Sequence, residues 1–423
     1  MSEQNNNRRE FMTHSALAAT GAALLTGGVH AGGSEIIKVG VIGCGGRGSG
    51  AAGNILDADS KVEITALGDV FQSQAEGAAQ RLGRKYGERV KASKGKGIFS
   101  GLDAYKQVLD TDIDLVILAT PPGFRPYHIE AAIEAKKNIF TEKPVAVDVT
   151  GIRKCLELVK KSKDAGIGIV AGTQRRHQTG YIETIKRIKD GAIGDVTSAR
   201  AYWNGNGIWF RGRQPGMSDT HYQIHNWYHF LWTCGDHIVE QHVHNLDVIN
   251  WVLGAHPISA SGMGGRSNRP VGDPNSVGHI FDHFSVEYEY PNNVFVQSFC
   301  RQIEGTTSSV SEAVVGTKGI SQVNGYNING KRVFEGKEIN PYVQEHMDLI
   351  ASIREGKPLN ELEQVTISTM TAILGRMSTY AGIRLTWKDV MEKAKEDTFP
   401  AKIDLTAPLP VTPVPVVGKT RFF

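Results

Sequence analysis

The stretch Glu35–Leu56, "EIIKVGVIGCGGRGSGAAGNIL", decides the fold. It begins with Ile36–Ile42, a mostly apolar run rich in β-branched residues, which is typical of a strand buried in a parallel sheet. Gly43, Gly45 and Gly48 follow at once in the spacing G-x-G-x-x-G, and the remaining residues can continue as a helix. The stretch therefore predicts a strand, a tight turn and a helix.

Each glycine of that turn has a physical reason. The first allows the sharp turn, the second lets backbone approach a pyrophosphate, and the third lets helix and strand pack closely. The free N–H groups at the helix start then attract phosphate oxygens. The predicted dinucleotide-binding residues of this turn are Gly43, Gly45, Gly46, Arg47 and Gly48.

A second predicted strand, Val62–Asp69, ends in an acid about 20 residues beyond the last glycine, where a ribose-binding carboxylate belongs. Asp69 favours NAD as the cofactor, because a carboxylate repels the 2′-phosphate of NADP. Arg47 could pair with that phosphate, so NADP stays possible.

Further alternation of strands and helices predicts a doubly wound sheet. Asp112–Pro122 is expected to hold a buried strand, a helix is expected near Tyr127–Lys136, and a strand at Lys137–Pro144. Ligands of such sheets lie off the carboxyl ends of the strands. The residues expected there, near the nicotinamide, are Thr120, Pro121, Glu142 and Lys143.

Residues 1–31 are predicted to be a twin-arginine signal peptide. Arg8 and Arg9 lie in "NRREFM", a short apolar segment follows, and "VHA" ending at Ala31 is a small-residue cleavage site. A disordered tail with a chance arginine pair is the alternative. The pattern predicts export to the periplasm, or otherwise out of the cytoplasm, by the twin-arginine translocase, which carries folded proteins.

The composition of the chain limits the classes of partner that we expect it to bind. The 423 residues are 40% hydrophobic and 22% charged, with a net charge of +3, so nothing indicates a nucleic-acid partner. No segment is long and apolar enough for stable membrane insertion. The four cysteines are scattered without paired spacing and predict no disulfide framework.

Three stretches, "GVIGCGGRG", "ATPPGFRPYHIEAAIEAKKNIFTEKPVAV" and "GAIGDVTSARAYW", resemble the glucose–fructose oxidoreductase/inositol dehydrogenase/MocA family, and the likeness covers Glu35 to about Trp387. The resemblance implies an α/β protein with an N-terminal Rossmann domain and a C-terminal α/β domain. The second domain has a large open, mostly antiparallel sheet that often mediates homo-oligomers. We expect the Rossmann domain at 35–155, the second domain at 156–397 and a proline-rich tail at 398–423. The tail either wraps the protein's surface or a neighbouring subunit, or is a disordered linker.

The resemblance also implies catalytic residues. Lys143 matches the family lysine that contacts the substrate hydroxyl and the nicotinamide, and an ammonium there can stabilise an alkoxide or relay its proton. His244 aligns with the family histidine, and Glu240 takes the place of the usual aspartate. At i, i+4 the two are expected to share a helix face, so that the carboxylate orients the imidazole as a base.

The segment 221–244 carries six of the fourteen histidines, so a metal site is an alternative. No H-E-x-x-H order appears, and we predict no metal.

Aromatic, guanidinium and imidazole groups suit a sugar, because aromatic faces stack on C–H-rich sugar faces while polar groups bind hydroxyls. Core packing or a subunit contact is the alternative for each. On this chemistry Trp203, Trp209 and Arg211 are predicted to bind substrate. Arg176, with His177 beside it, is predicted to do so because its segment resembles the strand-end arginine stretch of the family.

The sequence thus predicts an exported NAD(P)-dependent oxidoreductase that moves hydride between a sugar or polyol hydroxyl and tightly bound nicotinamide. One alternative is a redox-neutral glycosidase that works by transient oxidation and elimination. Another is a non-catalytic sugar-binding protein with a structural dinucleotide.

Overall fold

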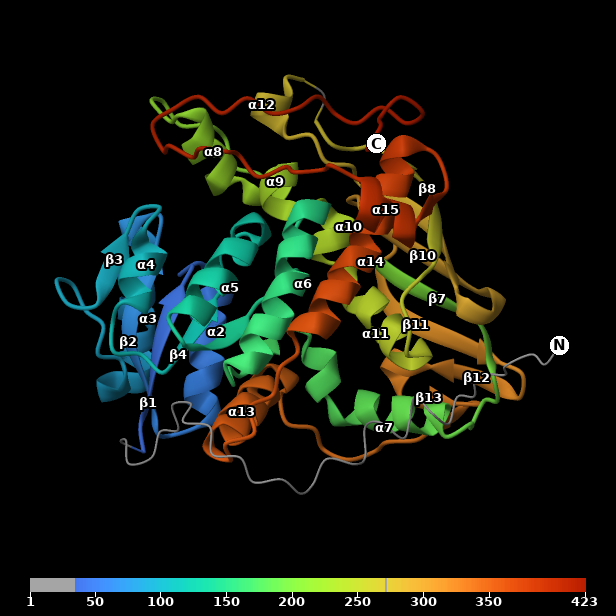
Figure 1. The fold of residues 1–423 in the computed structure, drawn as a ribbon, viewed down its shortest axis with the longest axis horizontal. Coiled ribbons are helices and arrows are strands. Elements are labelled where there is room, and N and C mark those ends of the chain that lie inside the picture. The colour runs from blue at the N-terminus through green and yellow to red at the C-terminus, as the bar shows by residue number, and fades with distance from the viewer. Residues whose placement is uncertain (1–34, 271) are drawn as a thin grey trace. The chain divides into compact units, whose positions relative to one another are not determined.

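Six parallel strands form the first sheet of the computed structural model, which describes residues 35–270 and 272–423 (Figure 1). Their order is β3-β2-β1-β4-β5-β6, and β4 is buried along its whole length, as expected of a strand covered on both faces. The strands are β1 (Ile37–Ile42), β2 (Val62–Asp69), β3 (Ile98–Ser100), β4 (Leu115–Leu118), β5 (Asn138–Thr141) and β6 (Ile169–Ala171).

Helices connect these strands in the doubly wound manner that the alternation predicts. The helices are α2 (Gly46–Ala58), α3 (Gln72–Tyr86), α4 (Ala104–Leu109), α5 (Arg125–Glu134) and α6 (Val149–Asp164). The predicted signal peptide, residues 1–31, lies outside the described residues.

Within the described residues nine strands form the second sheet, in the order β14-β13-β12-β11-β7-β10-β9-β8-β15, and of their pairs only β7–β10 is parallel. The predicted hairpin at 283–302 has the expected strand bounds, because Asn292 and Asn293 take the positive φ angles of a tight turn. The strands are β7 (Val196–Gly205), β8 (Ser259–Gly265), β9 (His283–Tyr290), β10 (Val294–Gln302), β11 (Ser309–Gly316), β12 (Gly319–Gln322), β13 (Asn327–Ile328), β14 (Lys331–Arg332) and β15 (Leu385–Thr386).

Helices pack on one face of this second sheet. The longest, α14, is almost wholly buried and ends at Gly382, whose φ of 68° is the left-handed conformation that glycine adopts readily. The helices that follow β6 along the chain, not all of which lie on this sheet, are α7 (Thr179–Lys189), α8 (Asp219–His225), α9 (Leu231–Cys234), α10 (His237–Glu240), α11 (Val243–Leu253), α12 (Pro274–Val277), α13 (Pro341–Arg354), α14 (Leu362–Ala381) and α15 (Trp387–Lys393).

The expected domain boundary at residue 155 is placed too early. Residue 155 lies inside α6, and the chain then adds β6 to the first sheet beside β5. Helix α13, far along the sequence, also packs on the first sheet through Leu349 and Ile350. The boundary was misplaced because the sequence does not show with which sheet the strand at 169–171 pairs.

The proline-rich segment 398–423 lies along the protein's own surface. In Figure 1 this red segment runs beside α8 and α9, and Phe399, Leu405 and Leu409 pack into an apolar cluster there. Of the two alternatives for this tail, the structure shows the packed one.

All four cysteines are buried and free, as the lack of paired spacing predicts. A search of the described residues finds no helix that could cross a membrane.

Candidate active site

The glycine turn connects β1 to α2 at the carboxyl end of the strand. Gly43 has a φ of 91°, and a Cβ there would lie 2.6 Å from the carbonyl carbon of Ala119. A Cβ on Gly48 would lie 1.8 Å from the carbonyl oxygen of Gly43, whereas one on Gly45 or Gly46 would meet no atom within 4 Å. The turn is therefore packed against β4 on one side and open on the other.

That open side fits the diphosphate of a dinucleotide. Helix α2 begins at Gly46, its N-cap Gly45 provides no side-chain cap, and no acid lies in its first turn. The N–H groups of that turn are available to an anion, and the helix dipole favours negative charge there.

Asp69 lies beside this turn at the end of β2. Its carboxylate accepts the backbone N–H of Cys44 at 2.7 Å and that of Phe71 at 2.9 Å. Burial raises the pKa of Asp69, while the two N–H donors lower it. An ionised carboxylate has about four acceptor positions, so two remain for ribose hydroxyls.

Arg47, predicted to contact the cofactor, is held by carboxylates. Its Nε donates to Glu142, its Nη2 lies 3.4 Å from Glu345, and its guanidinium stacks over Tyr342 at 5.1 Å. The carboxylate of Glu142 also packs closely against Gly172, the residue after β6. A Cβ at that position would lie only 2.6 Å from Oε2 of Glu142. Arg47 and Glu142 thus join α2, β5 and α13 behind the crevice.

Thr120 and Pro121 follow β4 at the same edge. Thr120 Oγ1 lies 3.2 Å from Nδ1 of His128, whose ring stacks on Tyr105 at 4.4 Å. Burial lowers the pKa of His128 to about 3, so its ring is neutral and suits packing.

Arg125, which sequence reasoning did not single out, ties two loops of this edge together. Its guanidinium donates to the carbonyl oxygens of Thr120, at 2.8 Å, and Pro144. Burial lowers its pKa to about 10, which leaves it cationic at neutral pH. The only signal in the sequence was its place just after the Pro-Pro turn.

Lys143 extends from the end of β5 to the second part of the chain. Its Nζ donates to the backbone carbonyl of Glu240 at 2.7 Å and to Oε1 of Glu240 at 3.1 Å. Both side chains are buried, with 9% and 8% exposed. Burial raises the pKa of Glu240, while the Lys143 ammonium opposes that shift.

Glu240 and His244 do not share one helix, and that expectation was wrong. The chain leaves α10 at Glu240 and begins α11 at Val243. In a continuous helix the Glu240 carbonyl would accept the His244 N–H, but here it accepts the Lys143 ammonium. The His244 N–H donates to Gln241 instead, at 3.3 Å. Glu240 therefore orients Lys143 rather than the imidazole.

His244 lies between the lysine and the inner face of the second sheet. Its ring stacks on Trp203 of β7 with centroids 5.7 Å apart and planes inclined by 20°. Burial, and then the positive charges of Lys143 and Arg175, hold its pKa well below the usual value. His244 is thus neutral at physiological pH.

Arg176 and His177 face carboxylates of the protein. Arg176 makes a bidentate ion pair with Asp247, at 2.9 to 3.1 Å, and lies over Trp251. His177 lies between Asp348 at 2.6 Å and Glu361 at 3.3 Å. Burial lowers the pKa of His177, but these two carboxylates outweigh it and raise the value to about 10.

Replacing Arg176 with methionine should lower the free energy of unfolding by about 3 kcal/mol, because Asp247 would stay buried without its cation. Ser368 still donates to Asp247, which keeps the cost near the low end for buried pairs. The matched change Arg187→Met breaks the exposed pair with Glu183 and should cost under about 0.5 kcal/mol. Equal denaturant midpoints for the two variants would contradict a buried structural role for Arg176.

A buried network around Glu312 was not predicted from the sequence. Its carboxylate accepts from Arg175 at 2.5 Å, from Asn245 at 2.6 Å and from Tyr181 at 3.2 Å. Because Asn245 follows His244 directly, the network fixes the start of α11. Glu312 showed no signal because it lies alone in a strand, far along the chain from its partners.

Trp209 and Arg211 lie in the segment between β7 and α8. The Arg211 guanidinium stacks over Trp209 at 4.4 Å, and Arg211 donates to the carbonyl of His225 at 2.9 Å. Trp209 is 37% exposed. Their observed contacts are with one another and with residues 225–229, so a role toward substrate stays a prediction.

The histidine-rich segment does not gather ligands for a metal: among residues 35–270 and 272–423, no group of three or more His, Cys, Asp or Glu side chains has that arrangement. His242, for example, contacts Ser298 at 2.7 Å.

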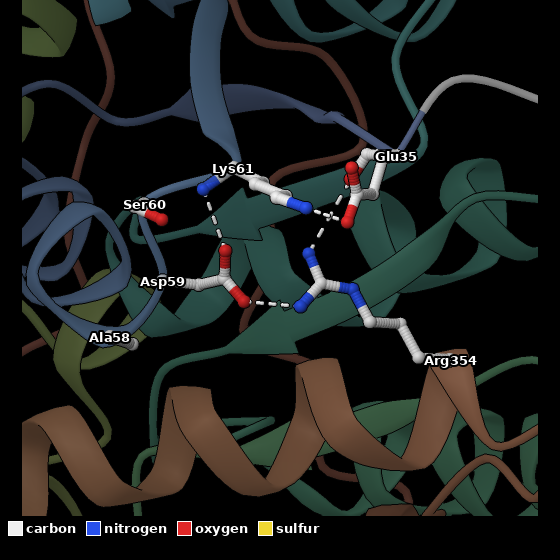
Figure 2. A pocket seen from close by; sticks show the side chains of 6 residues that line it. All are labelled: Glu35, Ala58, Asp59, Ser60, Lys61 and Arg354. Atoms are coloured by element: carbon white, nitrogen blue, oxygen red, sulfur yellow. Dashed lines mark hydrogen bonds and ion pairs between the residues drawn. The ribbon is translucent and has the colours of Figure 1, made fainter.

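The hollow in Figure 2, of about 390 Å³, lies at the opposite edge of the first sheet. Glu35 lies two residues before the start of β1 and Lys61 directly precedes β2, and they line the hollow with Asp59 and Arg354 through ion pairs. It therefore lies at the amino ends of the strands, away from the crevice.

Comparison with known proteins fits this geometry. Residues 37–167 match the oxidoreductase family with an NAD-binding Rossmann fold, and residues 181–322 match the GFO/IDH/MocA C-terminal domain. The chain belongs to this family of NAD-binding oxidoreductases. The family resemblance, the fold class and the NAD cofactor expected from the sequence are confirmed.

Individual relatives cover parts of the chain. It is 27% identical to scyllo-inositol 2-dehydrogenase (NAD(+)) of Bacillus subtilis (strain 168) over 237 residues. These aligned residues are 55% of this chain and 59% of that protein. It is 30% identical over 167 residues to 2,7-anhydro-N-acetylneuraminate hydratase of Escherichia coli (strain K12), 40% of each chain. The chain thus spans about half the length of these curated relatives.

Solved structures show the same fold. Myo-inositol dehydrogenase from Lactobacillus casei, in complex with NAD(H) and myo-inositol, has a TM-score of 0.61 at 19% identity, over 83% of this chain and 96% of that one. GenD2 from gentamicin A biosynthesis, in complex with NAD, has a TM-score of 0.64 at 19% identity, over 86% and 99%.

Proposed function

We propose that this NAD-binding oxidoreductase oxidises a carbinol of a sugar or polyol, or reduces the corresponding carbonyl. The observation that carries the proposal is the buried Lys143 ammonium at the carboxyl end of β5, held by Glu240 and near a neutral His244. Bound NAD supplies the hydride acceptor or donor. A charged donor beside a proton acceptor suits a hydroxyl that must lose its proton.

Each residue then has a role toward the substrate oxygen. Lys143 donates a hydrogen bond to it and stabilises negative charge that develops there. Glu240 keeps the ammonium in place, and His244 accepts the hydroxyl proton. Trp203, which lies against the imidazole, offers an aromatic face to the sugar ring.

Relatives support a sugar or polyol as substrate. Among them are scyllo-inositol 2-dehydrogenase of Bacillus subtilis and inositol 2-dehydrogenases of Rhizobium meliloti and Acidothermus cellulolyticus. An inositol carries ring carbinols, and oxidation of a carbinol needs the hydroxyl deprotonation that we assign to Lys143 and His244.

A second candidate is a redox-neutral reaction, in which oxidation acidifies a neighbouring C–H, a leaving group is eliminated and the hydride returns. The similarity to 2,7-anhydro-N-acetylneuraminate hydratase supports it, as does 31% identity over 188 residues to a glycosyl hydrolase family 109 protein of Streptomyces coelicolor. The same Lys143 and His244 would serve both reactions.

One screen separates the candidates. Purified protein is denatured to identify the released nucleotide, and native protein is offered polyols, aldoses and glycosides with and without an electron acceptor. Product formed only with stoichiometric nicotinamide reduction or an acceptor supports the dehydrogenase. Glycoside cleavage without net nicotinamide reduction and without an electron acceptor supports the redox-neutral route. Binding of a sugar with no product from any compound supports the non-catalytic sugar-binding protein.

Asp69→Asn should lower the preference for NAD over NADP by about tenfold or more. Repulsion between unit charges at about 4 Å is roughly 1 to 4 kcal/mol, depending on the local dielectric, and this change removes it for a 2′-phosphate. Dissociation constants for NADH and NADPH, measured by nicotinamide fluorescence, check the result. A preference equal to that of the unmodified protein would contradict the role of Asp69.

We propose export by the twin-arginine route from Arg8 and Arg9, which lie outside the described residues. Arg8→Lys combined with Arg9→Lys should leave the precursor in the cytoplasm of the producing cell. Fractionation and immunoblotting test this, and normal export of the double variant refutes the proposal.

A homo-oligomer formed through the second sheet is also proposed. The outer face of this sheet exposes apolar side chains on strands β8, β10, β11 and β12, which favours burial against another surface. These side chains are Met263, Phe295, Phe299, Val315 and Ile320. Light scattering during size exclusion should show more than one chain per particle, and a monomer at high concentration would contradict it.

A further inference from the structure

Three loops at the carboxyl edge of the first sheet meet α8 and the tail in one apolar cluster, called here the edge cluster. The loops follow β2, β3 and β4, whose carboxyl ends lie at the same edge of the sheet as the glycine turn. From the loops come Phe71, Leu102 and Phe124; from the segment around α8 and α9 come Met217, Tyr222, Ile224, Phe230 and Trp232; from the tail come Phe399, Ile403, Leu405, Leu409 and Val411.

Phe71 links this cluster to the ribose-binding carboxylate. It lies two residues after Asp69 and its N–H donates to that carboxylate at 2.9 Å. Its ring lies 4.7 Å from the ring of His221 and 6.3 Å from that of His225, both on α8. Helix α8 therefore lies against the adenosine end of the crevice.

The tail contacts α8 through hydrogen bonds in which side chains of α8 and its N-cap donate to backbone carbonyls of the tail. Ser218 donates to Leu405 at 2.5 Å and Thr220 donates to Ala407 at 3.1 Å. Gln223 donates to the backbone carbonyl of Leu409, two residues further along the tail. Each bond fixes a different residue at the start or in the body of α8.

The root of the tail is anchored in the core. Glu396 pairs with Arg376, which is fully buried, and Thr398 donates to Asp148 at 2.6 and 2.7 Å. Phe399 then inserts among three aromatic rings from the loop after β4, from α5 and from α9, with centroid distances of 4.6 to 5.9 Å. The rings are those of Tyr127, Phe124 and Trp232.

We propose that the tail and α8 together close the adenosine end of the crevice and retain NAD across many turnovers. The inference rests on NAD binding at the glycine turn. To leave, the nucleotide must part Phe71 from His221, and that movement disrupts the edge cluster and the tail bonds together. Release is therefore coupled to a local opening rather than to the loss of the nucleotide's own contacts alone.

Two truncations test the proposal. One ends the chain at Asp397 and removes every tail residue of the edge cluster. The matched control ends the chain at Thr412 and keeps every tail residue of the edge cluster. It removes only the segment in which Gly418 contacts the end of α14 and in which Val414 and Phe422 pack on the apolar core beneath the second sheet. Each protein is loaded with NAD and mixed with excess NADH, and exchange is followed by nicotinamide fluorescence.

The chain ending at Asp397 should exchange NAD at least about tenfold faster than the full chain, and the chain ending at Thr412 should match the full chain. Phe399→Ala in the full chain should move the rate in the same direction, and it keeps the test valid if the shorter chain does not fold. Equal exchange rates in the full chain and in Phe399→Ala overturn the retention proposal while NAD binding stands. Absence of NAD uptake by the full chain overturns both.

Discussion

Replacing Lys143 with methionine should reduce turnover by about 10²- to 10⁴-fold while NAD still binds. Methionine fills a similar volume but supplies neither a donor nor a charge at the substrate oxygen. The side chain lies at the end of β5, whereas the predicted diphosphate site lies at the start of α2, so the two functions separate. Initial rates with the preferred substrate and an NADH titration measure both.

The control for this variant is Lys160→Met, which removes an exposed ammonium on α6 that pairs with the neighbouring Asp164. Its turnover should equal that of the unmodified protein. Because Lys143→Met leaves Glu240 buried without its cation, the double change with Glu240→Gln checks that lost turnover is not lost folding. Turnover of Lys143→Met within about threefold of the unmodified protein would remove the lysine from the mechanism.

Gly48→Ala should abolish measurable NAD binding, or weaken it by about 100-fold or more. Its Cβ would lie 1.8 Å from the carbonyl oxygen of Gly43, so α2 must move away from the turn. The amide groups that receive the diphosphate move with it, and overpacking of this kind costs about 1 to 3 kcal/mol of stability. Calorimetric titration with NAD and thermal unfolding measure the two effects.

Gly83→Ala is the matched change. Gly83 lies within α3 and a Cβ there meets no atom within 4 Å, so the new methyl group should leave NAD affinity unchanged. Alanine should also raise stability slightly, since glycine inside a helix costs roughly 1 kcal/mol relative to alanine. Similar NAD affinities for Gly48→Ala and Gly83→Ala would show that the close approach at Gly48 is not needed for the site.

The first part of the fold was predictable because its signals are local. The apolar run of β1 ends where the glycines begin, and the run of β2 ends at Asp69. Asp69 lies beside the glycine turn, as its spacing from the glycines indicates. The hairpin β9–β10 was equally clear, since its alternating pattern is interrupted only by Pro291–Asn293. In such segments a few neighbouring residues determine the structure.

The rest depends on partners distant in sequence. Arg176 looked like a substrate contact, but Asp247 lies 71 residues further on and takes its guanidinium. Glu240 and His244 have helical spacing, yet a lysine 97 residues earlier takes the carbonyl that would have continued the helix. Periodicity carries no information about such long-range competition for a backbone group.

The account depends most on where NAD lies, and a crystal structure of the full chain with NAD tests it most directly. We expect the diphosphate on the amide groups at the start of α2, the ribose hydroxyls on Asp69, and the nicotinamide ring in contact with Lys143 and facing His244. A dinucleotide bound with its nicotinamide away from Lys143, or crystals soaked in NAD that show none in the crevice, would contradict the account.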